Sequence, residues 1–425
     1  MRITKIPLII VLLLATMPLC GQTEKKVFSI EDAVLYAKEN NLDIKISRND
    51  LELSKLKNNT SWNSISPTAE INGNISDDFE NDKKDYSVTG SINMKLSANL
   101  ATSIKGAQLD FESKQLAYTQ TVRNVELTVR KKFYELLFEN ENLALQKRNL
   151  ETAKTQYERN QEKFKSGQMS ELDVMTSRVN YQQKTPDYEK AQVSFQNKMA
   201  SFKQLLGMDI GQQLEIAGSL DDVLKIKKIH LDKVEVEAAP DVEIAKNAVE
   251  SKKNSLLAAR FSALGPSISA GYSYGKSRSD SNDEWQTSNK LSLGVRIPLD
   301  GWLPWSTGAV SAADSKQNLL NAEKKLEKVL ISVQVNKDNY VREINHGISL
   351  IDSLKANVEL ADETYDMTRT AYNYGKTDLQ SLQRSSDSVM EAGVALKEQA
   401  YNLICSILDL ENLLGLPFGT LGFDR

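Results

Sequence analysis

The chain has 425 residues, of which 40% are hydrophobic, 26% charged and 7% aromatic, and its formal net charge is −4. This length exceeds that of one small domain, and a nearly balanced charge provides no basic field for nucleic acid. Two His and two Cys residues are too few for a Cys/His zinc cluster, and the negative mean hydropathy of −0.42 argues against a bundle of membrane-spanning helices.

The start of the chain has the pattern of an export signal. Arg2 and Lys5 precede a run from residue 6 to residue 14 that is apolar except for one proline. This order predicts a secretory signal peptide over residues 1–21. A transmembrane anchor is the alternative, but the run is too short to cross a bilayer. Lipidation of Cys20 is an open alternative, although the preceding residue, Leu19, is larger than the small residue that such sites usually carry.

Four segments follow the period of two residues that is typical of β-strands. Each has an apolar face and a face of Ser, Asn, Thr and Lys, and polar loops join the members of each pair. Each is long enough to cross a bilayer as a tilted strand, although a soluble sandwich would show the same alternation. Four strands cannot close a barrel, so strands in a membrane would have to be pooled from several chains. The segments are 68–76, 86–99, 267–274 and 291–299.

Long helices are predicted for most of the remaining chain. Their sequences are rich in good helix formers and have sparse apolar positions, which favours coiled-coil-like pairs that line a wet space. Pro186 lies inside one of them and is expected to kink it. The long helices are expected over 103–165, 170–206, 306–374 and 377–414, and shorter ones over 30–59 and 241–264.

The chain is a duplication. Gly167 and Gly375 are separated by 208 residues, and the same offset relates Gly207 to Gly415. The repeated unit is a short helix, a strand hairpin, a long helix, a turn and a further helix. The predicted divisions are a first repeat over 22–215, a linker over 216–240, a second repeat over 241–417 and a C-terminal tail over 418–425.

These features resemble the TolC-like outer membrane efflux proteins. The resemblance rests on the expected export signal, on the duplicated unit, on the turns Phe164-x-x-Gly167 and Tyr372-x-x-Gly375, and on the Leu-Leu-Gly sequence that closes each repeat. It implies an α+β membrane protein in which three chains form a twelve-stranded outer-membrane β-barrel. A periplasmic α-helical barrel would continue this β-barrel.

The resemblance also implies a function and partners. The protein would be a passive exit duct of a tripartite efflux pump for small molecules, located in the outer membrane and extending into the periplasm. It would be no enzyme and would need no cofactor. Its partners would be two further copies of itself, a periplasmic adaptor protein, an inner-membrane pump and outer-membrane lipid, but no nucleic acid.

The same resemblance implies functional residues at the helical tips. Tyr372 and Asp173 occupy the positions of a hydrogen-bonded gate that closes the tip. Gly167 and Gly375 form the turns that would dock the adaptor. A solvated acid and a core aromatic residue are the alternative interpretation of the gate pair.

At the position of a tunnel constriction this chain departs from the pattern of the family. Some relatives carry two carboxylates beyond the second tip glycine, where this chain has Ser381 and Arg384. Asp378 and Asp387 lie nearby but are displaced. Three copies of Arg384 would favour anions, whereas an Arg on a solvated helix face would have no such role.

Other functions are weighed against this one. A type I protein secretion channel has the same architecture and remains open. An exported coiled-coil adhesin or scaffold would not need four alternating strands. An enzyme is not indicated, because no catalytic Ser/His/Asp set and no phosphate-binding loop occur in the sequence.

Overall fold

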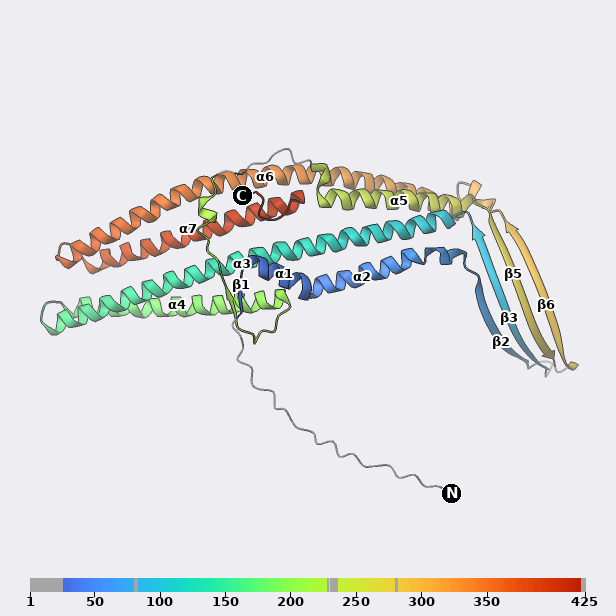
Figure 1. Cartoon of the computed structure of the whole chain (residues 1–425), viewed down its shortest axis with the longest axis horizontal. Coiled ribbons are helices and arrows are strands. Elements are labelled where there is room, and N and C mark those ends of the chain that lie inside the picture. The colour runs from blue at the N-terminus through green and yellow to red at the C-terminus, as the bar shows by residue number, and fades with distance from the viewer. Residues whose placement is uncertain (1–25, 80–82, 228, 230–235, 280–281, 422–425) are drawn as a thin grey trace, which may run out of the picture.

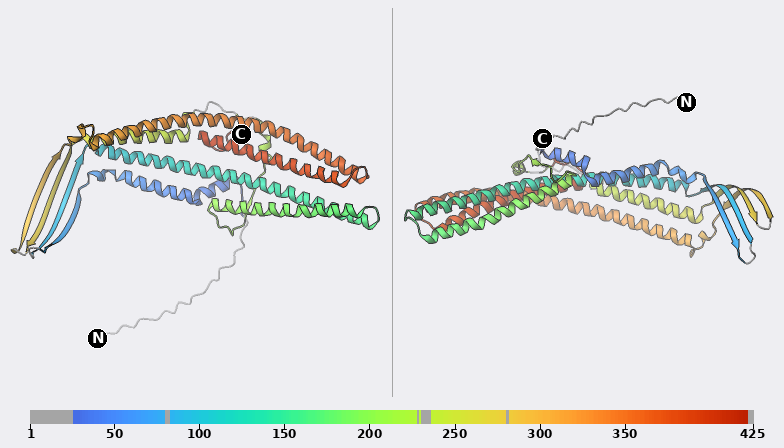
Figure 2. Two further views of the ribbon diagram at one scale, coloured as in Figure 1. Left: turned by 180° about the vertical axis from the view of Figure 1, so that it is seen from behind. Right: turned by 90° about the horizontal axis from the view of Figure 1, so that it is seen from below.

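The computed structural model describes residues 26–79, 83–227, 229, 236–279 and 282–421. The expected signal peptide and Cys20 lie outside these residues. The molecule is elongated, with a sheet at one end and long helical hairpins that reach to the other (Figure 1). Figure 2 shows from below that the helices form a thin layer.

Seven α-helices account for most of the described residues. The helices α3 and α6 have 66 and 67 residues, so each is a rod of roughly 100 Å at about 1.5 Å per residue. The four long helices are confirmed with ends within three residues of those predicted, and α4 continues through Pro186. The bounds are α1 (Ile30–Asn40), α2 (Leu42–Asn59), α3 (Leu100–Lys165), α4 (Glu171–Leu206), α5 (Pro240–Leu264), α6 (Thr307–Asn373) and α7 (Leu379–Leu414).

The prediction of one continuous helix over 30–59 is wrong, because the helix is interrupted at Asn41. The side-chain Oδ1 of Asn41 accepts hydrogen bonds from the N–H groups of Asp43 at 2.9 Å and Ile44 at 3.2 Å, which caps the start of α2. Its Nδ2 donates to the carbonyl of Leu205 at 2.8 Å. The capping bonds and this distant contact together favour a break over a continued helix.

The sheet at the end of the molecule consists of two antiparallel hairpins. Its strands are β2 (Thr68–Asp78), β3 (Lys83–Ser97), β5 (Ser267–Ser279) and β6 (Asn282–Arg296), in the order β2-β3-β5-β6. The polar loops predicted between the strands are shorter than expected. Backbone pairing continues through polar residues, as where Asp77 lies opposite Lys84, because ladder hydrogen bonds do not require an apolar side chain.

The register assembles one apolar and one polar face. Tyr272 of β5 lies opposite Ile92 of β3 and Leu291 of β6, and side chains directly opposite each other share a face. The neighbouring residue Gly271 lies opposite Asn93 on the polar face. The alternation of apolar and polar residues in the sequence therefore corresponds to the two faces of the sheet.

The main hydrophobic core lies where the shorter helices meet the middle of the long ones. Phe133 of α3 is 2% exposed, and its ring centroid lies 6.2 Å from that of the buried Phe202 of α4. Ile404 and Ile407 of α7 belong to the same core. Burial of each such side chain contributes about 1.5–3 kcal/mol, so the middle of the molecule holds the two repeats together.

A short parallel pair joins the beginning of the first repeat to its end. The strand β1 (Lys26–Phe28) pairs with β4 (Leu214–Ile216). This pair was not predicted, because strands of three residues are too short to show a period. The domain boundaries proposed from the sequence stay a prediction.

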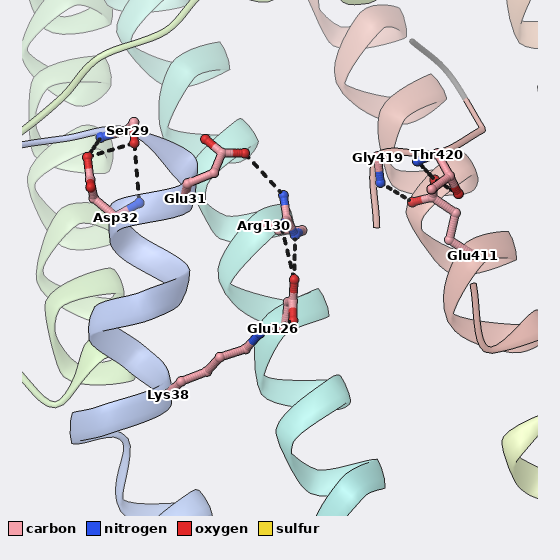
Figure 3. Close-up of polar contacts among 9 residues, drawn as sticks. All are labelled: Ser29, Glu31, Asp32, Lys38, Glu126, Arg130, Glu411, Gly419 and Thr420. Atoms are coloured by element: carbon pink, nitrogen blue, oxygen red, sulfur yellow. Dashed lines mark hydrogen bonds and ion pairs between the residues drawn. The ribbon is translucent and has the colours of Figure 1, made fainter. Parts of the chain in front are cut away.

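The segment after α7 folds back onto the core. The Glu411 side chain is fully buried and accepts hydrogen bonds from the N–H groups of Gly419 at 2.9 Å and Thr420 at 2.7 Å (Figure 3). Arg123 of α3 donates to the backbone carbonyl of Glu411 and lies over the ring of Phe418, 4.7 Å from its centroid. These contacts fix the first residues of the C-terminal tail.

Ion pairs attach α1 to α3 beside this segment. Glu126 contacts Lys38 at 2.7 Å and Arg130 at 3.0 Å, and Arg130 lies 3.8 Å from Glu31 (Figure 3). Burial alone would raise the pKa of Glu126, but hydrogen bonds from Lys38 and Arg130 hold it below its ordinary value. Glu126 therefore remains charged at neutral pH and ties the two helices together.

Candidate functional site at the helical tips

The turns α3–α4 and α6–α7 form the end of the molecule opposite the sheet (Figure 1). Gly167 and Gly375 have φ angles of +73° and +68°. Each glycine N–H donates to the carbonyl three positions back, Phe164 at 2.9 Å and Tyr372 at 3.0 Å. The left-handed conformation favours glycine. An added Cβ would meet nothing within 4 Å at either position, so the backbone angle, and not space, is the constraint.

A Ser and an Asp three residues apart lie at the start of each helix that follows a turn, but in opposite order: the Ser comes first in α4 and the Asp comes first in α7. Ser170 caps α4 and bonds the N–H of Asp173 at 3.1 Å, and its hydroxyl donates to the Asp173 carboxylate at 2.6 Å. Asp378 caps α7 and accepts from the N–H of Ser381 at 2.6 Å. Hydrogen bonds from Ser381 lower the pKa of Asp378. Asp173, Asp378 and Ser381 therefore each have a structural role at a helix start.

The structure does not join Tyr372 to Asp173 by a hydrogen bond among the described residues. The Tyr372 hydroxyl donates instead to Oδ1 of Asn160 on α3, at 3.2 Å. Asn160 is fully buried, and its Oδ1 also accepts from Gln156 at 2.8 Å. Burial is the largest cause that raises the pKa of Tyr372, and the charge of Asp173 also raises it. The two predicted residues are thus neighbours, but the gate pairing between them stays a prediction.

The proposed constriction residues point to different surroundings. Asp387 accepts from Lys184 of α4 at 2.6 Å and from Asn149 of α3 at 3.4 Å, so it joins three helices. Arg384 is exposed, and its charge contributes to the low pKa of Asp378. Asp378 and Ser381 belong to a helix cap, and Asp387 belongs to an interhelical ion pair. Arg384 takes part in neither, and its charged side chain is exposed.

Sequence reasoning missed Asn160, Lys184 and Asn149. Each is a polar residue inside a long, mostly polar helix, and no spacing distinguishes it from its solvated neighbours. A cavity of about 30 Å³ lies beside them, lined by Asn149, Gln156 and Asp387 among others.

Two general properties accompany this site. In the described part of the chain, no helix combines the length and the apolar composition needed to cross a bilayer. The same part contains no group of three or more His, Cys, Asp or Glu residues arranged to hold a metal ion.

Comparison with known proteins places both repeats in one family. The family described as "Outer membrane efflux protein" matches residues 41–208 and 235–416. The curated relative "Outer membrane protein TolC" of Vibrio cholerae is 22% identical over 318 residues, which cover 70% of this chain and 69% of that protein.

Solved structures share the fold at low sequence identity. The Campylobacter jejuni CmeC outer membrane channel superposes with a TM-score of 0.76 and 17% identity, covering 93% of this chain and 87% of that one. The open state of the Neisseria gonorrhoeae MtrE outer membrane channel gives 0.73 and 17%, covering 91% and 89%.

Proposed function

Because this chain belongs to the outer membrane efflux protein family, we propose that three copies assemble into one passive exit duct of a tripartite efflux pump. The protein is an outer-membrane efflux protein that extends into the periplasm. The proposal adds the number of chains, the small-molecule cargo, and the two partners that bring this cargo to the tip, a periplasmic adaptor and an inner-membrane pump.

The open sheet is the observation that carries the proposal. The order β2-β3-β5-β6 leaves one side of β2 and one side of β6 without a strand partner among the described residues. Unpaired backbone groups in lipid cost several kcal/mol each, and bacterial barrels begin at about eight strands. Pairing of each β6 with the β2 of the next copy closes a ring, and three copies supply twelve strands.

The helical flanks support the same closure. Leu172, Met175 and Val179 follow one face of α4 and are 75%, 48% and 52% exposed, and Leu360 and Met367 of α6 are each 65% exposed. Because α3 and α7 pack against each other inside the chain, α4 and α6 form its two flanks. In a ring of copies each α4 would meet the α6 of the next, and these apolar residues would be covered.

We assign the gate and the docking surface to the tips. Tyr372 contributes the gate contact, with Asn160 or Asp173 as its partner. The exposed turns at Gly167 and Gly375 receive the adaptor, and three copies of Arg384 give the adjoining tunnel a preference for anions. The tip position supports this assignment, because cargo from the inner membrane enters at the end opposite the sheet.

Extraction from outer membranes in mild detergent tests the assembly. We expect a mass near three times that of the 47.5 kDa chain, less any leader, and discrete conductance steps from this species in planar bilayers. A monomer, or an oligomer without conductance, would contradict the proposal.

A further inference from the structure

The polar face of the sheet carries two basic side chains at the end that joins the helices (Figure 1). Lys95 of β3 is two residues from Asn93, which lies on the polar face, and it lies opposite Ser269 of β5. Arg296, the last residue of β6, lies opposite Ser267, also of β5. Alternate residues of a strand point to one face, and side chains directly opposite each other share it. Lys95 and Arg296 therefore lie on the polar face, with two short serines between them.

Neither basic side chain is neutralised by a described residue. Both are exposed, and neither takes part in a hydrogen bond or an ion pair within the part of the chain that the structure describes. On the other side of β3, the strand β2 begins at Thr68, opposite Asn93, and so does not reach Lys95. Both charges are therefore available to a solute.

The middle of the polar face has no net charge. Glu70 lies opposite Ser91, and Ser91 lies opposite Ser273. Lys290 lies opposite the same Ser273, so Glu70 and Lys290 are level with each other and their charges offset. This level is four residues of β5 beyond Ser269, or roughly 13 Å at about 3.3 Å per residue.

The remaining acidic residues of the four strands lie at the outer turns, far from the helices. Asp85, the nearest of them, is ten positions before Lys95 in β3, roughly 33 Å along the strand. This separation exceeds the Debye length of about 10 Å at 0.1 M salt, so these acids do not cancel the charge at the helix end. They are Asp77, Asp78, Asp85, Asp283 and Glu284.

The helix ends next to the sheet are basic as well. In the six residues of α2, α3, α5 and α6 that are nearest the sheet, the charged residues are Lys55, Lys57, Lys105 and Arg260. Asp300 is the one acidic residue in the connections between these helix ends and the strands. The junction of sheet and helices therefore keeps a net positive charge when the neighbouring residues of every element are counted.

We propose that Lys95 and Arg296 form a basic ring that selects anionic small molecules as cargo of the duct. The inference rests on the proposed assembly of three copies, in which the apolar face of the sheet meets lipid and the polar face lines the lumen. Three copies then place six positive charges in one ring at the junction of barrel and helical tunnel. Rings of Arg and Lys side chains line pores that favour anions.

The width of such a barrel lets the ring act on passing solutes. Twelve strands spaced about 4.8 Å apart and tilted by about 40° give a radius of roughly 12 Å. Inward-pointing Lys and Arg side chains carry their charges to within about 10 Å of the axis, which is the Debye length at 0.1 M salt. Six charges at this distance enrich a monovalent anion on the axis about fivefold. Salt near 1 M, where the Debye length is about 3 Å, removes this enrichment.

Reversal potentials of the detergent-extracted oligomer in planar bilayers test the ring. The probes are potassium and chloride and, in a second series, potassium and glutamate. All measurements use an Arg384→Gln background, which removes the charge near the tip. The test variant adds Lys95→Gln and Arg296→Gln. Lys95→Gln alone is matched by Lys276→Gln, which removes one charge from the apolar face, where Lys276 lies opposite Val88.

We expect the Arg384→Gln background to favour either anion over potassium in about 0.1 M salt and to lose this preference in about 1 M salt. Adding Lys95→Gln and Arg296→Gln should lower the anion-to-cation permeability ratio at least about fivefold, and Lys95→Gln alone about twofold. Lys276→Gln should leave the ratio unchanged. An unchanged ratio in the test variant, or an equal loss in Lys276→Gln and Lys95→Gln, would overturn the proposal.

A failure of the ring can be separated from a failure of the duct. Because neither basic side chain is bonded to a described residue, the variants should retain their oligomeric mass and total conductance. If the wild type gave no conducting oligomer, the proposed duct would be wrong. A conducting oligomer without anion preference in the Arg384→Gln background would overturn the ring alone.

Discussion

The hydroxyl of Tyr372 on α6 donates a hydrogen bond to Oδ1 of Asn160 on α3, 3.2 Å away. This contact joins the second repeat to the first near the tip turns, where the proposed gate would open by separation of the hairpins. Asn160 is also held by Gln156, so the acceptor has a fixed position. Breaking this bond should release α6 without disturbing the core.

We expect Tyr372→Phe to raise single-channel conductance and the entry of vancomycin into cells. Loss of one hydrogen bond of about 1 kcal/mol changes the ratio of closed to open states about fivefold. Tyr374→Phe is the control, since that side chain is 76% exposed. If Asn160→Ala reproduces the effect and Asp173→Asn does not, Asn160 is the gate partner; the reverse favours Asp173. No change in Tyr372→Phe would eliminate the gate.

The tip glycines give a second prediction. Gly167→Val and Gly375→Val place a β-branched residue at φ angles of +73° and +68°, which costs roughly 1–2 kcal/mol or more and should distort the turn. Export should fall while the oligomer still assembles. Gly73→Val is the control, because that strand position is open and has no positive φ. Normal export in both tip variants would remove the docking role of the turns.

The fold was predictable where a period is long enough to be counted. Strand alternation, helix composition and the offset of 208 residues between Gly167 and Gly375 led to the duplicated unit and to the family, and the family match confirms that resemblance. The beginning of β6 at Asn282 was missed. Around Asn289 both faces are polar, so the alternation of apolar residues disappears there.

The site was less predictable, because its contacts join residues far apart in the chain. Asn160 lies 212 positions from Tyr372 and resembles any solvated amide on a polar helix. The pairing of Asp387 with Lys184 is likewise invisible in the spacing of either helix. Local motifs located the turns, whereas the cap role of Asp378 and the partners across the hairpins became visible only in the packed structure.

Ion selectivity tests the role of Arg384. If its exposed charge faces the tunnel, Arg384→Gln should shift the reversal potential under a salt gradient toward cation preference. Lys376→Gln removes a charge from an exposed side chain in the turn itself and is the control. An unchanged reversal potential in Arg384→Gln would place this residue on an ordinary solvated face.

The buried Glu411 carboxylate should stabilise the folded chain through the C-terminal segment. Glu411→Gln keeps the size of the side chain but removes the charge that strengthens the bonds from Gly419 and Thr420. We expect a loss of about 1.5–3 kcal/mol and a lower Tm in detergent. Glu398→Gln, at an exposed position of the same helix, should leave Tm unchanged. An equal Tm in both variants would show that the charge of Glu411 and its hydrogen bonds from Gly419 and Thr420 contribute nothing to stability.

Alkaline pH should weaken the middle of the molecule through Tyr134. Burial raises the pKa of this phenol from 10.0 to about 12. Because the folded-state pKa exceeds the unfolded one, the stability is fully present below pH 10 and is lost as the pH rises through about 12. Between pH 10 and 12 the ionisation of Tyr134 should lower the free energy of unfolding by up to about 1.4 kcal/mol per pH unit.

Denaturant unfolding at several pH values tests this prediction. Tyr134→Phe should reduce the slope of the free energy of unfolding against pH, and Tyr374→Phe serves as the control. If Tyr134→Phe retained the wild-type slope between pH 10 and 12, the alkaline sensitivity would have another origin.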